Sequence, residues 1–349
     1  MTGLPKRAGS IFGKSLLRLS NQKALSGPLL NLGSETDMTF SKLLWTGLAL
    51  FSLSTAALAA DPATLRIGYQ KGSIALLLAK ENGLLDKRFP HTTVQWIEFP
   101  AGPQMLEALN VDALDIGSTG DIPPLFAQAA GADLVYIGAE PAKPQAETVL
   151  VRGDSPLQNV ADLKGKKVAF QRGSSSHNLI LRALNKAGLS YQDIQPVNLP
   201  PADARAAFEQ GSVDAWVTWE PYSSLALSQG NARVLANGEG LGLSGPVYTA
   251  RRAYANANGA FVHALLDELT DAEALTRSQR QDSLKVIKKY MGLPDAVITS
   301  YVDNRPPSPV LPIDQSIINA QQFTADLFYQ NKLLPKKIAV RDAVWQGTD

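Results

Sequence analysis

The sequence predicts an α/β protein with two βαβ lobes, joined by a hinge and separated by a ligand cleft. From residue 64 onward, short β-rich runs alternate with helical ones, and the alternation occurs in two series. A proline-rich stretch, Pro141–Pro144, separates the series, and a late β-rich run, Val247–Arg251, is expected to return to the first lobe. With 349 residues and 45% hydrophobic content, the chain is long enough for two domains that each have a core.

The first series predicts a largely parallel sheet. Its β-rich runs indicate strands, and its apolar residues at helical spacing indicate helices, the first of which should stop near Gly83. In order along the chain, the strands are expected over 65–69, 94–99, 115–117 and 134–138, and the helices over 74–85, 103–109 and 122–130.

The second series has the same character and is followed by a mainly helical tail. Strands are expected over 147–152, 167–171, 195–199 and 214–219, and helices over 174–187, 202–210, 259–275, 281–291 and 314–330. Two crossings, near 146–150 and 247–250, then form a hinge, and a hinged cleft can close on a ligand. The expected boundaries are 60–148 with 249–349 for lobe 1, and 149–248 for lobe 2.

The segment 38–59 is predicted to be a secretory signal peptide. It has a short basic start, Met38–Lys42, an apolar run, Leu43–Leu53, and a small-residue cleavage site, Ala57–Ala59. The apolar run is too short to span a membrane. Met38 is therefore expected to be the true start, with 1–37 an extension that is not translated. A basic amphipathic presequence is the alternative for 1–37.

Composition excludes several classes of function. The chain has no cysteine, so it offers no disulfide, no thiolate nucleophile and no lipid-carrying cysteine. Beyond residue 59 it holds 27 Lys and Arg against 30 Asp and Glu, a net charge of about −3. It has no basic run with interleaved aromatics, so no nucleic-acid partner is expected. No cofactor or metal is expected, and the mature protein is predicted to be soluble and periplasmic, without a lipid anchor.

Four strand-to-helix corners predict one binding site. Each follows a predicted strand, and ligands of open α/β sheets bind outside the carboxyl ends of strands. Small residues expose the backbone there, hydroxyls can donate, and the N-terminus of the next helix favours an anion. The candidate ligand-binding residues are Gln70, Lys71 and Gly72 in the first corner, Ser118, Thr119, Gly120 and Asp121 in the second, Ser174, Ser175 and His177 in the third, and Trp219 and Glu220 in the fourth.

The chain resembles the periplasmic solute-binding proteins of ABC importers for aliphatic sulfonates, within the wider group that binds taurine and nitrate. Matching stretches run through the mature chain: RIGYQKG at 66–72, EFPAGPQ at 98–104, PPLFAQAAG at 123–131, ADLKGKKVA at 161–169, LPPADARAAF at 199–208 and DAWV at 214–217. The resemblance implies a type II periplasmic-binding-protein fold. It also implies a binding protein, not an enzyme, that captures an alkanesulfonate in the four corners and delivers it to a membrane permease for sulfur uptake. A monomer is expected, because each lobe must move freely about the hinge.

Two departures from the family pattern leave the ligand open. Asp121-Ile122 stands where Glu-Thr is more usual, and Glu220 stands where Asp is usual. Both carboxylates are interpreted as helix-start residues, although a Glu220 that faces the cleft would favour a ligand with an ammonium group. Taurine, a sulfate ester or nitrate is the alternative ligand. An enzyme of the related pyrimidine-synthesis-like branch is a further alternative, but it would need cysteine and histidine chemistry.

The roles of several side chains also stay open at this stage. Lys71 either contacts the anion or lies at the rim, and His177 either donates to the ligand or is satisfied by local packing. Trp219, Tyr69 and Tyr222 are candidates for the wall around the organic tail, whereas Trp216 is expected in the core.

Overall fold

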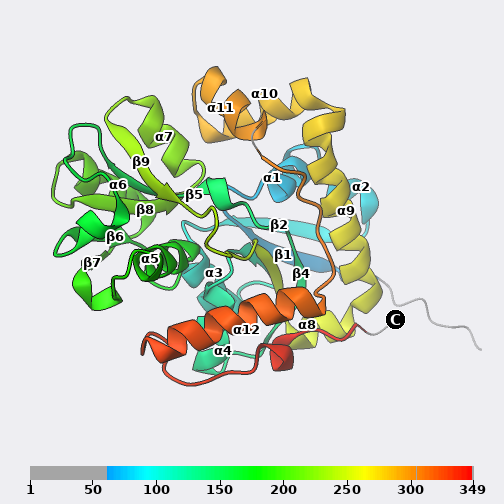
Figure 1. The fold of residues 1–349 in the computed structure, drawn as a ribbon. Coiled ribbons are helices and arrows are strands. Elements are labelled where there is room, and N and C mark those ends of the chain that lie inside the picture. The colour runs from blue at the N-terminus through cyan, green and yellow to red at the C-terminus, as the bar shows by residue number, and fades with distance from the viewer. Residues whose placement is uncertain (1–60, 304, 348–349) are drawn as a thin grey trace, which may run out of the picture. The chain divides into compact units, whose positions relative to one another are not determined.

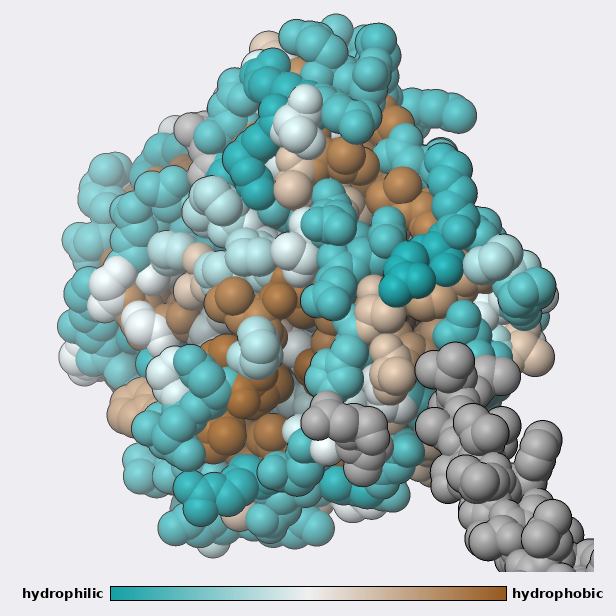
Figure 2. Space-filling model, turned by 90° about the vertical axis from the view of Figure 1, so that its right-hand side faces the viewer, coloured by the Kyte–Doolittle hydropathy of each residue, from teal (hydrophilic) through white to brown (hydrophobic). Residues whose placement is uncertain are grey.

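The computed structural model describes residues 61–303 and 305–347, and these form a mixed α/β structure around two five-stranded sheets (Figure 1). The predicted signal peptide and the extension before it lie outside the described residues. Most large apolar side chains are buried, and the face in Figure 2 is mainly hydrophilic with apolar patches. Within the described ranges, no helix combines the length and apolarity needed to cross a membrane.

The first sheet has the strand order β2-β1-β3-β10-β4. Strand β1 is parallel to both β2 and β3, whereas β10 inserts antiparallel between β3 and β4. The return of 247–251 to this sheet is confirmed, but the sheet is mixed because that strand arrives from the opposite direction. The bounds are β1 Thr64–Tyr69, β2 Thr93–Glu98, β3 Ile116–Thr119, β4 Leu134–Ala139 and β10 Val247–Arg251.

Helices pack against the first sheet, and the apolar side chains between them form the core. The predicted helix over 74–85 is divided at Gly83 into a buried apolar helix, which packs against the long helix of the C-terminal part, and a short second helix. The buried apolar helix is α1 Ile74–Glu81, the short second helix is α2 Leu84–Arg88, and the long C-terminal helix is α9 Gly259–Ser278. The others are α3 Gly102–Asn110, α4 Pro123–Ala130, α8 Arg252–Ala257, α10 Arg280–Met291, α11 Asp295–Asp303 and α12 Gln315–Gln330.

The second sheet has the strand order β7-β6-β8-β5-β9. Strand β6 is parallel to β7 and β8, while β5 is antiparallel to β8 and β9. The edge strand β9 was not predicted, because its partly exposed sequence lacks a buried alternating face. The bounds are β5 Glu147–Arg152, β6 Lys167–Phe170, β7 Gln195–Asn198, β8 Ala215–Trp219 and β9 Ala232–Asn237. The helices are α5 Ser175–Lys186, α6 Pro201–Glu209 and α7 Tyr222–Ser228.

The two segments that join the sheets, 140–146 and 238–246, run side by side. The Glu140 N–H donates to the Pro246 carbonyl at 2.8 Å, and the Gly238 N–H donates to the Pro144 carbonyl at 2.8 Å. Gly245 lies directly against the Glu140 carbonyl, where a side chain would have no room. The crossings are therefore two neighbouring backbone segments that can bend together, as a hinge requires.

The helices α4, α5 and α12 bring the two lobes into contact on one side. Leu181 of α5 packs with Leu125 of α4 and Phe328 of α12 in one buried apolar cluster. The Arg182 guanidinium donates to the Thr324 hydroxyl at 2.8 Å. Helix α12 crosses below α5 in Figure 1. This contact fixes one wall beside the space between the sheets.

Candidate functional site

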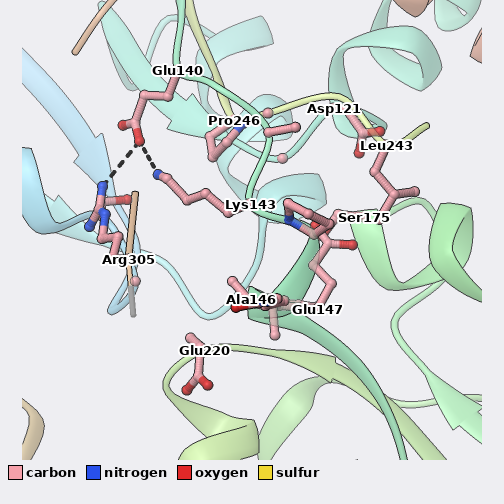
Figure 3. A pocket seen from close by; sticks show the side chains of 18 of the residues that line it. Asp121, Glu140, Lys143, Ala146, Glu147, Ser175, Glu220, Leu243, Pro246 and Arg305 are labelled. Carbon is pink, nitrogen blue, oxygen red and sulfur yellow. Dashed lines mark hydrogen bonds and ion pairs between the residues drawn. The ribbon is translucent and has the colours of Figure 1, made fainter. Parts of the chain in front are cut away.

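A cavity of about 900 Å³ lies between the two lobes. This volume is in the range of small-molecule sites, and the cavity lies where the four predicted corners meet (Figure 3). Both crossings and the segment after α11 also line it. Of the predicted site residues, those in the lining are Gln70, Gly72, Ser118, Thr119, Gly120, Asp121, Ser174, Ser175, Trp219 and Glu220.

The first two corners form the wall contributed by the first lobe. The Gln70 side-chain amide donates to the Ser118 carbonyl at 3.2 Å and so ties the end of β1 to that of β3. The Thr119 hydroxyl donates to the Gly120 carbonyl at 2.9 Å. The hydroxyl proton, which was expected to face an anion, is therefore already used in a local hydrogen bond. Thr119 can serve a ligand as a donor only if this local bond breaks.

The third corner faces the second across the cavity. Gly120 lies against the Ser175 side chain, so the two corners touch where β3 ends and α5 begins. The Ser174 hydroxyl donates to the Gln171 carbonyl at 2.7 Å, whereas the Ser175 side chain lies against Gly120 of the first lobe. Ser175 is therefore part of a cross-lobe arrangement, while Ser174 holds its own turn.

The fourth corner faces the first. Gly72 lies so close to the Glu220 carbonyl that a Cβ at Gly72 would be 2.8 Å from that oxygen. The Glu220 carboxylate accepts from the Ser224 N–H at 3.2 Å and from the Ser224 hydroxyl at 2.8 Å. The carboxylate thus holds the first turn of α7, the helix-start role expected from the sequence, although Glu220 also lines the cavity.

His177 and Lys71 do not line the cavity. The His177 ring is fully buried among aromatic side chains, with ring centroids 4.9 Å from Phe328 and 5.2 Å from Phe170. Its Nδ1 accepts from the Gly173 N–H at 3.3 Å, and burial lowers its pKa to about 3. The prediction that His177 contacts a ligand is therefore wrong in this geometry, and packing is its role. Lys71 is exposed and lies outside the lining.

Of the aromatic residues considered in the sequence analysis, one lines the cavity and three do not. Trp216 is 1% exposed in a core cluster, as expected. Trp219 lines the cavity, with the Tyr222 ring 6.0 Å away behind it. Tyr69 is buried in the core of the first lobe, and neither Tyr69 nor Tyr222 belongs to the lining. Among these aromatic candidates, Trp219 is the one that lines the cavity.

Asp121 joins the two lobes through a buried hydrogen bond. Its Oδ2 accepts from the Asn178 side chain of α5 at 2.6 Å, and Arg182 lies near enough to lower its pKa. Burial outweighs both effects and raises the pKa of Asp121 to about 7. Burial and the neighbouring Asp121 raise the pKa of Glu147 to about 8. Asp121 is therefore more than the helix-start residue expected, because its carboxyl group bonds across the lobes.

A cluster of three charged residues in the lining was not predicted. Glu140 Oε2 accepts from both the Lys143 ammonium and, at 3.2 Å, the Arg305 guanidinium, and Glu140 Oε1 accepts from the Tyr248 hydroxyl at 2.9 Å (Figure 3). Lys143 lies in the proline-rich crossing that the sequence predicted. The sequence therefore indicated where in the fold Lys143 lies, but not which residues it contacts. Arg305 comes from the far C-terminal part, and nothing local in the sequence marks it.

The fold and this cavity define a class of protein. Two sheets joined by two crossings, with corners from both lobes around one cavity, are the architecture of a two-lobed solute-binding protein. The NMT1/THI5-like family description matches residues 93–279, and the chain belongs to that family, in the branch that contains the aliphatic sulfonate-binding proteins.

The similar proteins agree in fold and extent. The chain is 60% identical to the periplasmic aliphatic sulphonate binding protein SsuA from Escherichia coli, with 83% of this chain and 94% of that one covered and a TM-score of 0.77. It is 55% identical to the alkanesulfonate-binding protein SsuA from Xanthomonas axonopodis pv. citri, bound to MOPS, with 82% and 99% covered and a TM-score of 0.81. The taurine-binding periplasmic protein of E. coli K12 is 22% identical over 292 residues, covering 78% of this chain and 90% of that protein.

Proposed function

We propose that this protein binds an aliphatic sulfonate between its lobes and delivers it to the membrane permease of an ABC importer for sulfur uptake. The observation that carries the proposal is the meeting of all four corners around a single cavity of about 900 Å³. The high identity to the two sulfonate-binding proteins supports the choice of ligand class.

The chemistry of the lining suits a permanently charged anion with three acceptor oxygens. Backbone N–H groups of the second corner are candidate donors, and each hydrogen bond to a charged acceptor contributes about 1.5–3 kcal/mol. Several such bonds together give binding in the micromolar range, about −8 kcal/mol. The carboxyl groups of Asp121 and Glu147 oppose an anion only weakly at neutral pH, because burial favours their protonated forms.

The proposed role also requires that the lobes move and that the chain is exported. In the proposal, the lobes 60–148 with 249–349 and 149–248 close about the two crossings and present a closed, monomeric form to the permease. The leader 38–59 directs the chain to the periplasm, where the mature protein is soluble. The role is binding and not catalysis, which agrees with a chain that has no cysteine nucleophile.

Calorimetric titration of the mature protein tests the proposal. The ligands are methane- to octanesulfonate, taurine, an alkyl sulfate, inorganic sulfate and nitrate. Micromolar binding of one or more alkanesulfonates, with weaker binding of the inorganic anions, is expected. Tightest binding of taurine, the sulfate ester or nitrate would replace the ligand but keep the class. No heat with any of these anions would overturn the proposal.

A further inference from the structure

A buried cluster of two cations and one carboxylate lines the cavity next to the second corner. It consists of Lys143, Arg305 and Glu140, whose side chains are 13%, 5% and 3% exposed. The Tyr248 hydroxyl donates to Glu140, and Tyr248 of β10 is paired with Ser118 at the end of β3 in the antiparallel register of the two strands. The cluster is therefore connected to the corner that was expected to hold the anion.

The cluster has two positive charges and one negative charge, so one positive charge is not neutralised within it. Both oxygens of the Glu140 carboxylate are engaged, since one accepts from Tyr248 and the other from both cations. Of the buried acidic groups near these cations, Glu273 is engaged by the Arg277 guanidinium at 2.8 Å and adds no net negative charge. Burying an uncompensated charge is costly, so a surplus cation at a cavity wall calls for an anion.

The cations also keep unused donors. Arg305 Nη1 is buried and has no acceptor within the described chain. For the Lys143 ammonium the same residues provide one acceptor, Glu140, although an ammonium has three N–H donors. A buried donor left without a partner costs about as much as the hydrogen bond it could make. An oxygen-rich anion in the cavity would satisfy both groups at once.

We propose that Lys143 and Arg305, held together by Glu140, form a cationic seat that selects the anionic head group of the ligand. The inference rests on the proposed function, because it assigns the head-group end of the same cavity. In Figure 3, Arg305 and Leu243 lie at opposite sides of the view, and Trp219, Leu227 and Leu243 are apolar members of the lining. The head group is thus seated at the Arg305 side, and the organic tail extends toward Leu243 on the opposite side.

The test compares two Lys-to-Met variants by calorimetry. Lys143→Met removes one charge of the seat but leaves Glu140 paired with Arg305 and Tyr248. Lys71→Met is the matched control, because Lys71 is an exposed cation of the first corner that lies outside the lining. The probes are pentanesulfonate, the uncharged pentanesulfonamide, inorganic sulfate and nitrate. Thermal melting of both variants verifies that they fold.

Lys143→Met is expected to weaken pentanesulfonate binding about 10- to 100-fold and to reduce the preference for sulfonate over sulfonamide by a similar factor. Lys71→Met is expected to change either quantity less than 2-fold. Arg305→Lys, which keeps the charge but changes the donor geometry, is expected to lose less than Arg305→Gln.

The outcomes separate this inference from the proposed function. If wild type binds pentanesulfonate and Lys143→Met binds it as tightly as Lys71→Met does, the seat is refuted and the proposed function stands. If only sulfate or nitrate binds, and Lys143→Met loses that binding, the seat is supported and the sulfonate ligand is refuted. If no anion binds to wild type, both are refuted.

Discussion

The contact between Gly72 and Glu220 predicts that one added methyl group will hold the lobes apart. Gly72 belongs to the first corner, and the Glu220 carbonyl belongs to the fourth, on the other lobe. A Cβ at Gly72 would lie 2.8 Å from that oxygen, whereas ordinary contact begins at 3.4 Å. The shortfall is 0.6 Å, and the obstructing atom is backbone, so no side-chain rotation can relieve it.

The size of the effect follows from the cost of this overlap. Overpacking by a methyl group typically costs about 1–3 kcal/mol when the surroundings cannot move. The Gly72→Ala variant can avoid this cost if the lobes separate slightly, so the cost falls on the closed state and hence on binding. We therefore expect the dissociation constant for an alkanesulfonate to rise about 5- to 150-fold.

Calorimetry and small-angle scattering measure this prediction. Gly72→Ala should bind more weakly and should compact less than wild type when ligand is added. Gly153→Ala is the matched control, since a Cβ there meets only ordinary contacts of 3.7 Å or more and the residue does not line the cavity. If Gly72→Ala binds and compacts like wild type, the lobes do not need to meet at this point and the reasoning is refuted.

Three further predictions concern tail, charge and packing. Trp219→Ala should weaken octanesulfonate binding at least 10-fold in calorimetry yet leave inorganic sulfate or nitrate unchanged; equal losses would contradict a tail wall. The raised pKa values of Asp121 and Glu147 mean that the folded state keeps protons that the unfolded state has released, so the contribution of these two groups to the free energy of unfolding should fall as pH rises from about 4 to about 8. Asp121→Asn keeps the bond to Asn178, and urea unfolding should show it gaining stability over wild type at pH 8.5 compared with pH 5; a pH-independent difference would contradict the shift. His177→Ala should lower the free energy of unfolding by about 2–5 kcal/mol in the same assay, and no loss would contradict its core role.

The fold was predictable because its strands and helices carry strong local patterns. The strands β5 and β10 begin and end at the predicted residues, and both sheets have the expected parallel pairs. The edge strand β9 and the short helices α8 and α11 were missed, since partly exposed or short elements lack a clear period. The direction of β10 in its sheet depends on the path through the second lobe, which local patterns do not contain.

The site was predictable only where it follows strand ends. Corner residues such as Gly72 and Ser175 line the cavity because the carboxyl ends of strands from both lobes meet there. His177 carries the same local signal, but its place one turn into α5 directs the ring into the core and not into the cavity. Lys143 and Arg305 are separated by about half of the chain, and their meeting at Glu140 is a purely tertiary event.

The charge balance of the cavity explains how a site with more acidic than basic residues can accept an anion. Two cations line it, against five carboxyl groups: Asp121, Glu140, Glu147, Glu220 and Asp303. Glu140 and Asp303 are bonded to guanidinium groups, the Glu220 carboxylate is bonded to the first turn of α7, and burial favours the protonated forms of the other two. Burial also raises the pKa of Glu220. Each carboxyl group thus either has a guanidinium partner or has a pKa shifted toward its neutral form, whereas the two cations share one counter-charge. The formal count of acids and bases therefore misleads, and the sign of the field that a ligand meets is set by which groups keep an unpaired charge after folding.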